Sequence, residues 1–392
     1  MSDLLDLLTT FVVSGDEAKL RADVASHLAA IQASAQRGDR SIVGRVEDVI
    51  RESPQKFFQF DKEGFATLSA LGNEWCAGKF EIPSIEELKY RASQRQKPTS
   101  PSPVLRLFVL DGASPLTDIG SLQATSSPHS LFQVASQFNC LEAPVPRVVD
   151  VNEYFRDYTQ GPRASISAWP ATLLRHYAAP SATGARFIQS TDGDQIDLLR
   201  DACGPNAVRH GYFTGAGLDA AVIVSALESN FTKLRVGVHE NAQVLLGYNW
   251  DGAVDSPAPS IAQVFTSTAA GGTYGAQSNL GQQGFISAAT QLLRAAYLGT
   301  FLSAICLGKT RVVTTLIGGG VFSNPVPLIW EALTWAVEEV QKYISEDMDV
   351  FVNGRTLSEQ INMDDAVLPT VRKLNGAVFV FNQSGLGKAM RG

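Results

Sequence analysis

Two glycine-containing turns could hold an anion. Three consecutive glycines, Gly318–Gly320, follow a β-branched run at residues 311–317 and precede a segment of helical character at 327–344. Glycines remove side chains from the turn, so a ligand can lie directly on the backbone. The following helix directs its free N–H groups and the positive end of its dipole to the same place. Such an arrangement binds anions, most often phosphate. A tight packing turn is the alternative, and this turn alone favours neither.

The second turn comprises residues 157–167 and leads into a helix expected from Ala168. Thr159 and Gln160 offer hydroxyl and amide groups, and Gly161 lets the backbone approach a ligand. Taken alone, such a turn is more often a helix entry than a ligand loop. Together, the two turns could hold a diphosphate from both sides.

Other well-known site motifs are missing from the sequence. It has no GxxxxGK[ST] loop, no GxGxxG opening the first helix of its α/β part and no GxSxG elbow. A P-loop NTPase, a Rossmann dinucleotide fold and an α/β-hydrolase serine are therefore disfavoured. The five histidines show no HxxxH or HExxH spacing, so no metal site is expected. No cofactor is expected either.

Composition limits the choice of partners and location. A net charge of −7 without a long Lys/Arg cluster disfavours nucleic acid or an anionic membrane as the main partner. The four cysteines are far apart and form no CxxC pair, as expected of free thiols in a reducing compartment. The N-terminus lacks the bases of a signal peptide, and no run is expected to reach transmembrane length. We expect a cytoplasmic protein.

The chain divides into two parts of different texture. Apolar residues at helical spacing, first Leu20, Val24, Leu28 and Ile31, predict a helical N-terminal region over residues 1–97. The set Phe65, Leu68, Leu71 and Trp75 extends the same interpretation, and a further short helix is expected over residues 43–50. A proline-rich stretch predicts a linker at residues 98–103.

Residues 104–392 alternate between strand-like and helix-like segments, which predicts an α/β domain with a mixed sheet sandwiched by helices. Ligands on such sheets sit beyond the carboxyl ends of the strands. Residues 385–388 are interpreted as tail. Strands are expected at 104–110, 131–135, 234–238, 243–246, 261–265, 312–316, 350–352 and 377–381, and helices at 168–177, 218–229, 283–307 and 327–344.

Five blocks of the sequence resemble macrodomains of the MavL type, relatives of poly(ADP-ribose) glycohydrolase typified by an effector that removes ADP-ribose from ubiquitin. They follow the family's order and span about residues 115–350. The matching blocks are Leu131–Glu142 (LFQVASQFNCLE), Thr159–Pro162 with Arg175–Tyr177, Gly237–His239, Gln263–Ser267, and Leu316–Asn324 (LIGGGVFSN). The first hundred residues resemble no family that we can name.

The resemblance implies an ADP-ribose pocket in a macrodomain-like fold. On that plan, Asn139 points at the distal ribose, and the Gly161 loop and the Gly318–Gly320 loop, which continues into Val321, cradle the diphosphate. Phe322 packs over the distal ribose. Asp118, followed by Ile119, resembles the Asp-Ile pair that binds the adenine amine. Arg163 inside the first loop could either block a phosphate or hold it.

Hydrolysis of an ADP-ribosyl bond needs carboxylates near the anomeric carbon, to activate water and to stabilise positive charge. The candidates are Asp157, which fits the family's aspartate two residues before TQGP, with Glu240, Asp251 and Asp255. However, Asn241 and Gln243 stand where the relatives carry acids, and amides accept no proton at neutral pH. Glu240 could substitute for them or point to the opposite face of its strand.

Three functions remain open at this stage. The first is a hydrolase that releases ADP-ribose from a modified protein, with ubiquitin as one candidate, by cleaving an N- or O-glycosidic bond. The second is an ADP-ribose reader without turnover. The third is a scaffold that binds no nucleotide and whose N-terminal helices dock a protein partner.

Overall fold

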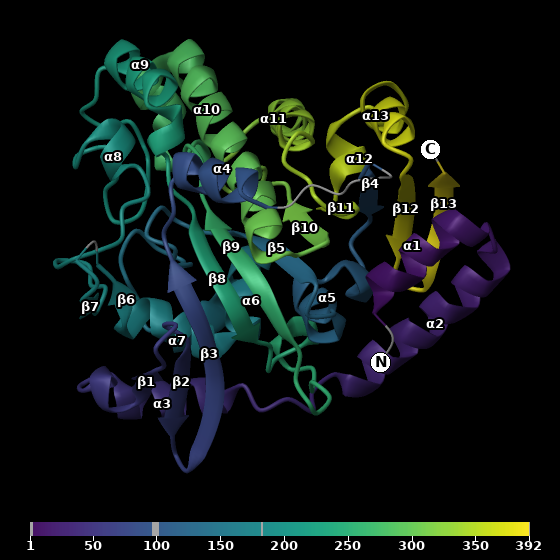
Figure 1. The fold of residues 1–392 in the computed structure, drawn as a ribbon, viewed down its shortest axis with the longest axis horizontal. Coiled ribbons are helices and arrows are strands. Elements are labelled where there is room, and N and C mark those ends of the chain that lie inside the picture. Colours follow the sequence, from purple (N-terminus) through teal and green to yellow (C-terminus); the bar gives the residue numbers. More distant parts are fainter. Residues whose placement is uncertain (1–2, 96–101, 182, 392) are drawn as a thin grey trace.

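An eleven-stranded sheet runs through the protein, and helices cover both of its faces (Figure 1). The computed structural model describes residues 3–95, 102–181 and 183–391. The strand order is β1-β2-β3-β8-β9-β5-β10-β11-β4-β12-β13. The predicted α/β class, with a mixed sheet between helices, is confirmed.

The sheet strands are β1 (Phe58–Phe60), β2 (Ala66–Ala70), β3 (Asn73–Glu81), β4 (Leu105–Asp111), β5 (Ser130–Ala135), β8 (Gly237–Gln243), β9 (Ser260–Thr266), β10 (Arg311–Thr315), β11 (Met348–Arg355), β12 (Ala377–Asn382) and β13 (Gly385–Arg391). A separate two-stranded ribbon pairs β6 (Ala179–Pro180) with β7 (Arg186–Phe187).

The helices are α1 (Leu4–Ser14), α2 (Glu17–Ser34), α3 (Ser41–Ile50), α4 (Ile85–Ser93), α5 (Ile119–Thr125), α6 (Gln160–Ser167), α7 (Trp169–Tyr177), α8 (Arg200–Cys203), α9 (Ala220–Ser229), α10 (Ala276–Leu307), α11 (Val326–Val340), α12 (Leu357–Gln360) and α13 (Leu368–Lys373), with a 3₁₀ helix, η3, at Val151–Arg156. Helices α4, α9, α10 and α11 group on one side of the sheet, and α5, α6 and α7 on the other (Figure 1). Helices α1 and α2 lie beside β12 and β13.

Six neighbouring strands, from β9 to β12, run parallel, and the remaining strand pairs of the large sheet are antiparallel. The carboxyl ends of the parallel strands therefore meet at one edge. The loops after β5, β9 and β10, three adjacent strands, leave this edge together. This edge is where ligands bind on open α/β sheets.

The N-terminal region is only partly helical. Leu20, Val24, Leu28 and Ile31 are buried along α2, as predicted. The predicted helix through Phe65 and Trp75 is wrong, because residues 58–81 form the meander β1–β2–β3. Every second residue of β2 is buried, as is typical of a strand. The apolar i, i+3 spacing matched that of a helix by coincidence. Leu71 and Gly72 both have positive φ, as a two-residue hairpin turn requires.

The sheet and the core continue across the predicted boundary between residues 1–97 and 104–392. Strand β3 pairs antiparallel with β8, with Phe80 opposite His239. Buried apolar residues from both parts belong to one large cluster. Of the predicted linker at 98–103, residues 98–101 lie outside the described part of the chain. The proposed division therefore separates neither two sheets nor two cores.

The predicted strands and helices of the second part are confirmed with shifted ends, except that the two strands expected at 234–238 and 243–246 are replaced by one strand, β8, at 237–243. The predicted tail at 385–388 begins β13, which pairs with β12 at the sheet edge. Arg21 of α2 donates to the carbonyl of Leu386 at 2.7 Å, so α2 packs beside this edge. Sequence patterns gave no signal for β13 because its glycines and lysine are typical of loops.

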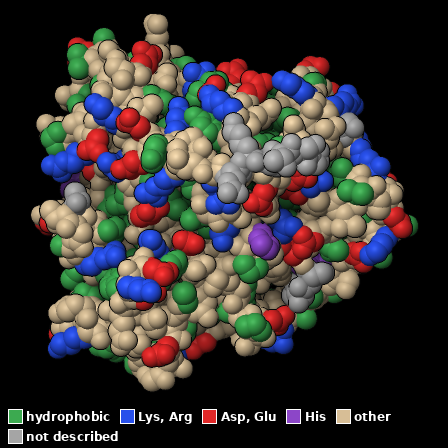
Figure 2. All heavy atoms as spheres, viewed as in Figure 1, with side chains coloured by type: hydrophobic (Ala, Val, Ile, Leu, Met, Phe, Trp, Pro, Cys, Tyr) green, Lys and Arg blue, Asp and Glu red, His purple; other side chains and the backbone are tan. Residues whose placement is uncertain are grey.

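Helix α10 corrects the expectation that no segment reaches membrane-spanning length. Its 32 residues are long and apolar enough to cross a membrane by length and composition, with a mean hydropathy of 1.2 in the best window. However, 72% of that window is buried inside the protein, and a buried core helix passes the same test. On the face shown in Figure 2, basic and acidic side chains are interspersed.

A close backbone approach before β12 generates a stability prediction. A Cβ added at Gly376 would lie 1.6 Å from the carbonyl oxygen of Leu107 in β4. We expect Gly376→Ala to lower the free energy of unfolding by about 2–4 kcal/mol, because backbone atoms have to separate. Urea unfolding measures this loss. The control Gly387→Ala, on edge strand β13 with 3.3 Å to its nearest neighbour, should stay within about 1 kcal/mol of the parent. Equal midpoints would contradict the prediction.

Candidate functional site

The predicted ligand residues come mainly from loops at the carboxyl edge of the parallel strands. We call the residues 136–143, 157–161, 267–275 and 316–324 the carboxyl-edge site. They follow β5, η3, β9 and β10 respectively. The two glycine turns predicted from the sequence both belong to it.

The triple-glycine turn combines a packed and an open part. Gly318 has φ +74°, and a Cβ there would lie 2.3 Å from Cγ2 of Thr268, so this position requires glycine. The Asn324 side chain braces the turn by donating to the carbonyls of Ala269 (3.0 Å) and Gly318 (3.2 Å). Gly320, in contrast, is exposed and has no neighbour within 4 Å of an added Cβ. Gly318 is therefore a packing position, Gly320 leaves the backbone accessible, and anion binding at this turn stays a prediction.

Buried polar atoms beside this turn lack partners. The hydroxyls of Thr266 and Thr268 and the side-chain oxygen of Asn324 have no hydrogen-bond partner among the described residues, although all three residues are at least 96% buried. A buried polar group without a partner is costly. A polar ligand or water bound at this turn would relieve that cost.

The TQGP turn forms the start of a helix earlier than predicted. Helix α6 begins at Gln160, so residues 160–167 are helical and α7 follows from Trp169. Thr159 is the N-cap residue but its side chain makes no capping bond. The Gln160 side-chain oxygen accepts from the backbone N–H of Ile119 at 2.9 Å. Gly161 is tightly packed, because an added Cβ would lie 2.7 Å from Oε1 of Glu142.

Glu142 is the residue that the sequence reasoning missed as a catalytic candidate. Burial raises the pKa of its carboxyl well above the ordinary value; the neighbouring carboxylate of Asp157 raises it further, and Arg175 partly offsets both. The residue is partly buried. Asp157 accepts from the backbone N–H of Thr159 at 2.9 Å. Two carboxyl groups thus lie close together at the start of α6.

A hydrogen-bonded frame holds Glu142. Its backbone N–H donates to the hydroxyl of Tyr154 at 2.8 Å, and that hydroxyl lies 2.7 Å from Nε2 of His176. Burial lowers the pKa of His176 to about 3, with Arg175 adding to the effect. The imidazole is therefore neutral, and its Nε2 accepts a hydrogen bond from the Tyr154 hydroxyl. The Gln137 amide bonds both the N–H and the carbonyl of Ala143, which fixes the residue after Glu142.

Arg175 and His239, both in the family-like blocks, are structural residues. Arg175 is fully buried, and burial lowers its pKa to about 10. Its guanidinium donates to the carbonyls of Cys140 (3.2 Å) and Ala171 (3.2 Å) and lies 3.1 Å from Nδ1 of His239. Burial, with Arg175, lowers the pKa of His239 well below its usual value. Its Nε2–H donates to the carbonyl of Ala77 at 2.7 Å, which ties β8 to β3.

Three aromatic rings connect the two turns. Tyr212 stacks on Tyr274 with centroids 4.9 Å apart, and Phe322 of the triple-glycine loop lies 5.9 Å from Tyr212 and 5.2 Å from Tyr274. The Tyr212 hydroxyl lies 3.3 Å from the carbonyl of Ala143, next to Glu142. Phe322 and the carboxyl pair are therefore on the same side of the site. Val321, predicted in the ligand set, is 63% exposed.

The predicted adenine contact is already occupied by protein groups. Asp118 is buried; Oδ1 accepts from the N–H of Ser121 (3.2 Å), and Oδ2 binds Nη1 of Arg163 (2.5 Å). Arg163 also covers the ring of Trp250 at 5.0 Å. Arg355 is close as well: burial lowers its pKa, Asp118 opposes this, and Arg163 adds to it. Arg163 thus forms an ion pair with Asp118, and the Arg355 guanidinium lies near enough to interact with both charges.

Asn139, predicted to face the distal ribose, is buried and makes two protein hydrogen bonds. Its side-chain oxygen accepts from the N–H of Leu141 (3.0 Å), and its amide donates to Oε1 of Gln195 (3.0 Å). The ribose and adenine contacts of Asn139 and Asp118 stay predictions. A ligand would have to share or displace these partners.

Glu240 and Asp251 do not join the carboxyl pair. Glu240 lines a hollow of about 220 Å³ with Lys79 and Cys306, between β3, β8, α4 and α10. Its neighbour His239 faces Arg175, so the alternation along β8 turns Glu240 the other way. The side chain of Asp251 is about one-third exposed and pairs with Arg40 at 3.6 Å.

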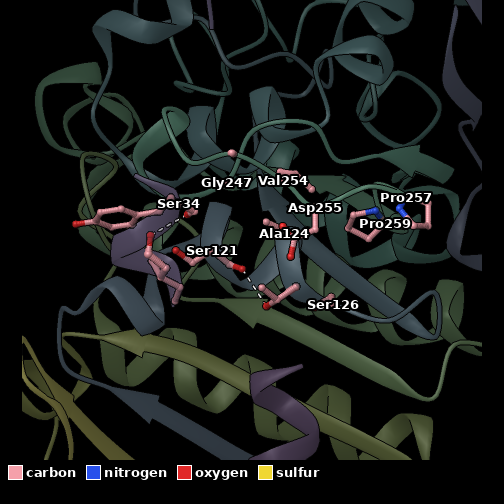
Figure 3. Close-up of a pocket in the computed structure, with 13 residues that line it drawn as sticks. Ser34, Ser121, Ala124, Ser126, Gly247, Val254, Asp255, Pro257 and Pro259 are labelled. Atoms are coloured by element: carbon pink, nitrogen blue, oxygen red, sulfur yellow. Dashed lines mark hydrogen bonds between the residues drawn. The ribbon is translucent and has the colours of Figure 1, made fainter. Parts of the chain in front are cut away.

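The hollow drawn in Figure 3 is also separate from the carboxyl-edge site. It has about 170 Å³ and lies between the ends of α2 and α5 and the loop at 247–259. Of the sequence candidates only Asp255 lines it. In the described part of the chain, no group of three or more His, Cys, Asp or Glu is placed to hold a metal ion. The four cysteines are free thiols.

Gln243 and Asn241, which stand where acids were expected, contact Cys76 of β3. Gln243 accepts from the N–H of Cys76 through its side-chain oxygen at 2.9 Å, and the carbonyl of Asn241 lies 3.3 Å from the Cys76 thiol. Asn241 has φ +55° in a bulge of β8. Both residues therefore contact β3, and neither belongs to the carboxyl-edge site. The available sequence signal for the missing acid was Glu142 itself, the last residue of the matched block 131–142.

Comparisons with known proteins found similarity only among solved structures. No family model matches the sequence, and no curated protein does. The chain is similar to poly(ADP-ribose) glycohydrolase from Thermomonospora curvata, with a TM-score of 0.42, 10% identity and coverage of 80% of this chain and 93% of that one. The same enzyme from Deinococcus radiodurans, in complex with ADP-ribose, has a TM-score of 0.42, 10% identity and coverage of 75% and 93%. At such low identity and TM-score, these similarities assign no activity to the chain.

The two parts of the triple-glycine turn should respond differently to a methyl group. Gly318→Ala places a Cβ against Thr268 at a left-handed φ, so we expect a loss of about 2–4 kcal/mol in the free energy of unfolding. Gly320→Ala, which meets no neighbour, should leave stability within about 1 kcal/mol of the parent. Thermal and urea unfolding of both variants measure the difference. A turn in which both glycines tolerate alanine equally would contradict this division.

Proposed function

We propose that this protein binds ADP-ribose and hydrolyses an ADP-ribosyl bond on a modified protein. The observation that carries the proposal is the pair Glu142 and Asp157, with the Glu142 carboxyl against Gly161. Acid–base groups thus lie at the start of the very turn that was predicted to hold the diphosphate. The five sequence blocks that resemble macrodomains of the MavL type support the same ligand.

Three features support an anionic ligand without reference to any family. The N-terminus of α6 presents backbone N–H groups with the positive end of its dipole. The guanidinium groups of Arg163 and Arg355 place positive charge near Asp118 and α6. The unpartnered hydroxyl of Thr268 adjoins Gly318, and Gly320 leaves the backbone open to a ligand.

The carboxyl pair is suited to hydrolysis at an anomeric carbon. Glu142, with its raised pKa, keeps a proton that it can donate to the leaving group as the bond from C1″ breaks. Asp157, as a carboxylate, accepts a proton from the attacking water as the new C1″–O bond forms. Proton exchange with solvent then restores both groups. The bond cleaved is an N- or O-glycosidic bond, and the products are ADP-ribose and the unmodified acceptor.

The modified protein and its cellular location are parts of the same proposal. The resemblance favours an ADP-ribosylated protein with ubiquitin as one candidate, and composition favours the cytoplasm. Docking of a protein partner on the N-terminal helices is also a proposal. Release assays on several ADP-ribosylated proteins would identify the preferred acceptor.

A reader without turnover is the second candidate. The positions where the relatives carry acids hold Asn241 and Gln243, which bind β3, and Glu240 and Asp251 point elsewhere. A scaffold that binds no nucleotide is the third candidate. This candidate is favoured because side chains of the same chain, Arg163 and Gln195, already bond the side chains of Asp118 and Asn139.

Binding and turnover separate the three candidates. Titration calorimetry with ADP-ribose should show saturable binding, and mono-ADP-ribosylated protein should release ADP-ribose at a rate above that of Gly319→Glu. That variant places a carboxylate on the cradle and should weaken binding at least about tenfold. Binding without release would select the reader. If ADP-ribose produced no heat and no release, the scaffold would replace both.

The raised pKa of Glu142 predicts the pH dependence of turnover. A proton donor acts only while protonated, so activity is present below its pKa and is lost as pH rises through it; this alkaline limb lies above the ordinary range of a glutamate. Glu142→Gln should lower kcat by about 10²–10⁴-fold and remove the alkaline limb.

The matched comparison is Glu240→Gln, a carboxyl group of the same kind in the separate hollow. It should keep the parent rate and the parent pH profile. A loss of activity in Glu240→Gln, with an unchanged Glu142→Gln enzyme, would reverse the assignment.

A further inference from the structure

A buried glutamate of the N-terminal region binds the segment that carries the carboxyl pair. Glu47 of α3 has no exposed surface. Its two carboxylate oxygens accept from the backbone N–H groups of Val151 (2.6 Å) and Asn152 (2.9 Å), the first residues of η3. The hydroxyl of Tyr177 in α7 donates to the same carboxylate at 2.8 Å. The Glu47 side chain therefore caps the start of η3.

Both members of the carboxyl pair depend on η3. Tyr154, in the middle of η3, accepts the backbone N–H of Glu142 through its hydroxyl. Asp157 directly follows η3, and its N–H donates to the carbonyl of Tyr154 at 3.0 Å. A shift of η3 would consequently move both carboxyl groups relative to each other and to Gly161.

The chemistry at this cap requires a carboxylate. Three donors converge on two oxygens, and an amide offers a single acceptor oxygen together with an NH₂ donor. Burial raises the pKa of Glu47, while the donors Asn152, Val151 and Tyr177 oppose this shift. Close packing adds to the constraint, because a Cβ added at Gly44, one turn earlier in α3, would lie 3.1 Å from the Asn152 side chain.

We infer that Glu47 is a positioning residue for the Glu142–Asp157 pair, so that the N-terminal region forms part of the active centre. This inference rests on the proposed function, and its structural part can be tested without it. Glu47 touches no substrate; it acts through η3, Tyr154 and Asp157. Removing one acceptor oxygen loosens η3 and leaves Gly161 and the triple-glycine turn in place.

The test uses the full chain with Glu47→Gln and the matched control Asp48→Asn on the same helix. Asp48 is 76% exposed and pairs with Arg51 at 3.2 Å. In Glu47→Gln, backbone amides at residues 151–157 should exchange hydrogen about 10- to 100-fold faster, because a charge-assisted bond is lost. Amides of the triple-glycine turn should be unchanged. Asp48→Asn should match the parent everywhere.

Kinetics provide the second measurement. Glu47→Gln should lower kcat about 10- to 100-fold, the cost of misplacing catalytic groups, with KM and the dissociation constant of ADP-ribose within about threefold of the parent. The alkaline limb should move to lower pH, because a loosened Glu142 is better hydrated and its pKa falls. If Glu47→Gln fails to fold, Tyr177→Phe removes one donor to the same carboxylate and should change exchange and kcat in the same direction, by about 3- to 10-fold.

The outcomes distinguish the two proposals. Parent protein that neither binds nor hydrolyses ADP-ribose would overturn the proposed function. In that case, faster exchange in Glu47→Gln confined to residues 151–157 would still show that Glu47 holds η3 in place. Active parent protein with an unchanged kcat, pH profile and exchange in Glu47→Gln would overturn the inference and leave the function standing. A uniform rise in exchange across the whole chain, in both Glu47→Gln and Tyr177→Phe, would also overturn it.

Discussion

The buried guanidinium of Arg175 is the interaction on which the site depends. It contacts the loop after β5 through the carbonyl of Cys140, α6 through the Ser165 hydroxyl (2.7 Å), and β8 through His239. It also lies 3.7 Å from the ring centroid of Phe265 in β9. A buried charge is costly unless it is fully hydrogen-bonded. The loop after β5, helix α6 and strands β8 and β9 can therefore take few alternative positions without breaking the contacts of Arg175.

Arg175 also influences the chemistry. Its positive charge favours neutral forms of His176 and His239 and partly counteracts the raised pKa of Glu142. Burial acts on Glu142 in the opposite direction and prevails. The pair thus combines a carboxyl group of raised pKa, that of Glu142, with the neighbouring carboxyl group of Asp157, in a frame of neutral hydrogen-bond partners. Removing Arg175 would change geometry and protonation together.

The sequence predicted the α/β class, most strands of the parallel sheet and both glycine turns, because those features are encoded in local periodicity and turn chemistry.

The predictions failed where contacts between distant segments determine the structure. The helix through Phe65 was wrong because i, i+3 spacing also fits a short hairpin strand. Strand β13 was missed because β12 stabilises a glycine-rich segment. Glu142 was missed as an acid because its proton affinity depends on Asp157 and on burial, which no local pattern records. Glu240 was misplaced because a strand period leaves the choice of face open.

The order of the strands also has a consequence for how the protein is made. Strand β4 lies between β11 and β12, and the N–H of Val104 bonds a side chain 243 positions later, that of Asp347. At typical synthesis rates, roughly 10 to 50 s pass before the ribosome has delivered these partners. Meanwhile β4 and the β1–β3 meander, whose neighbour β8 also comes late, present unpaired edges. Unpaired strand edges of this kind favour association with other chains until their own partners have been made.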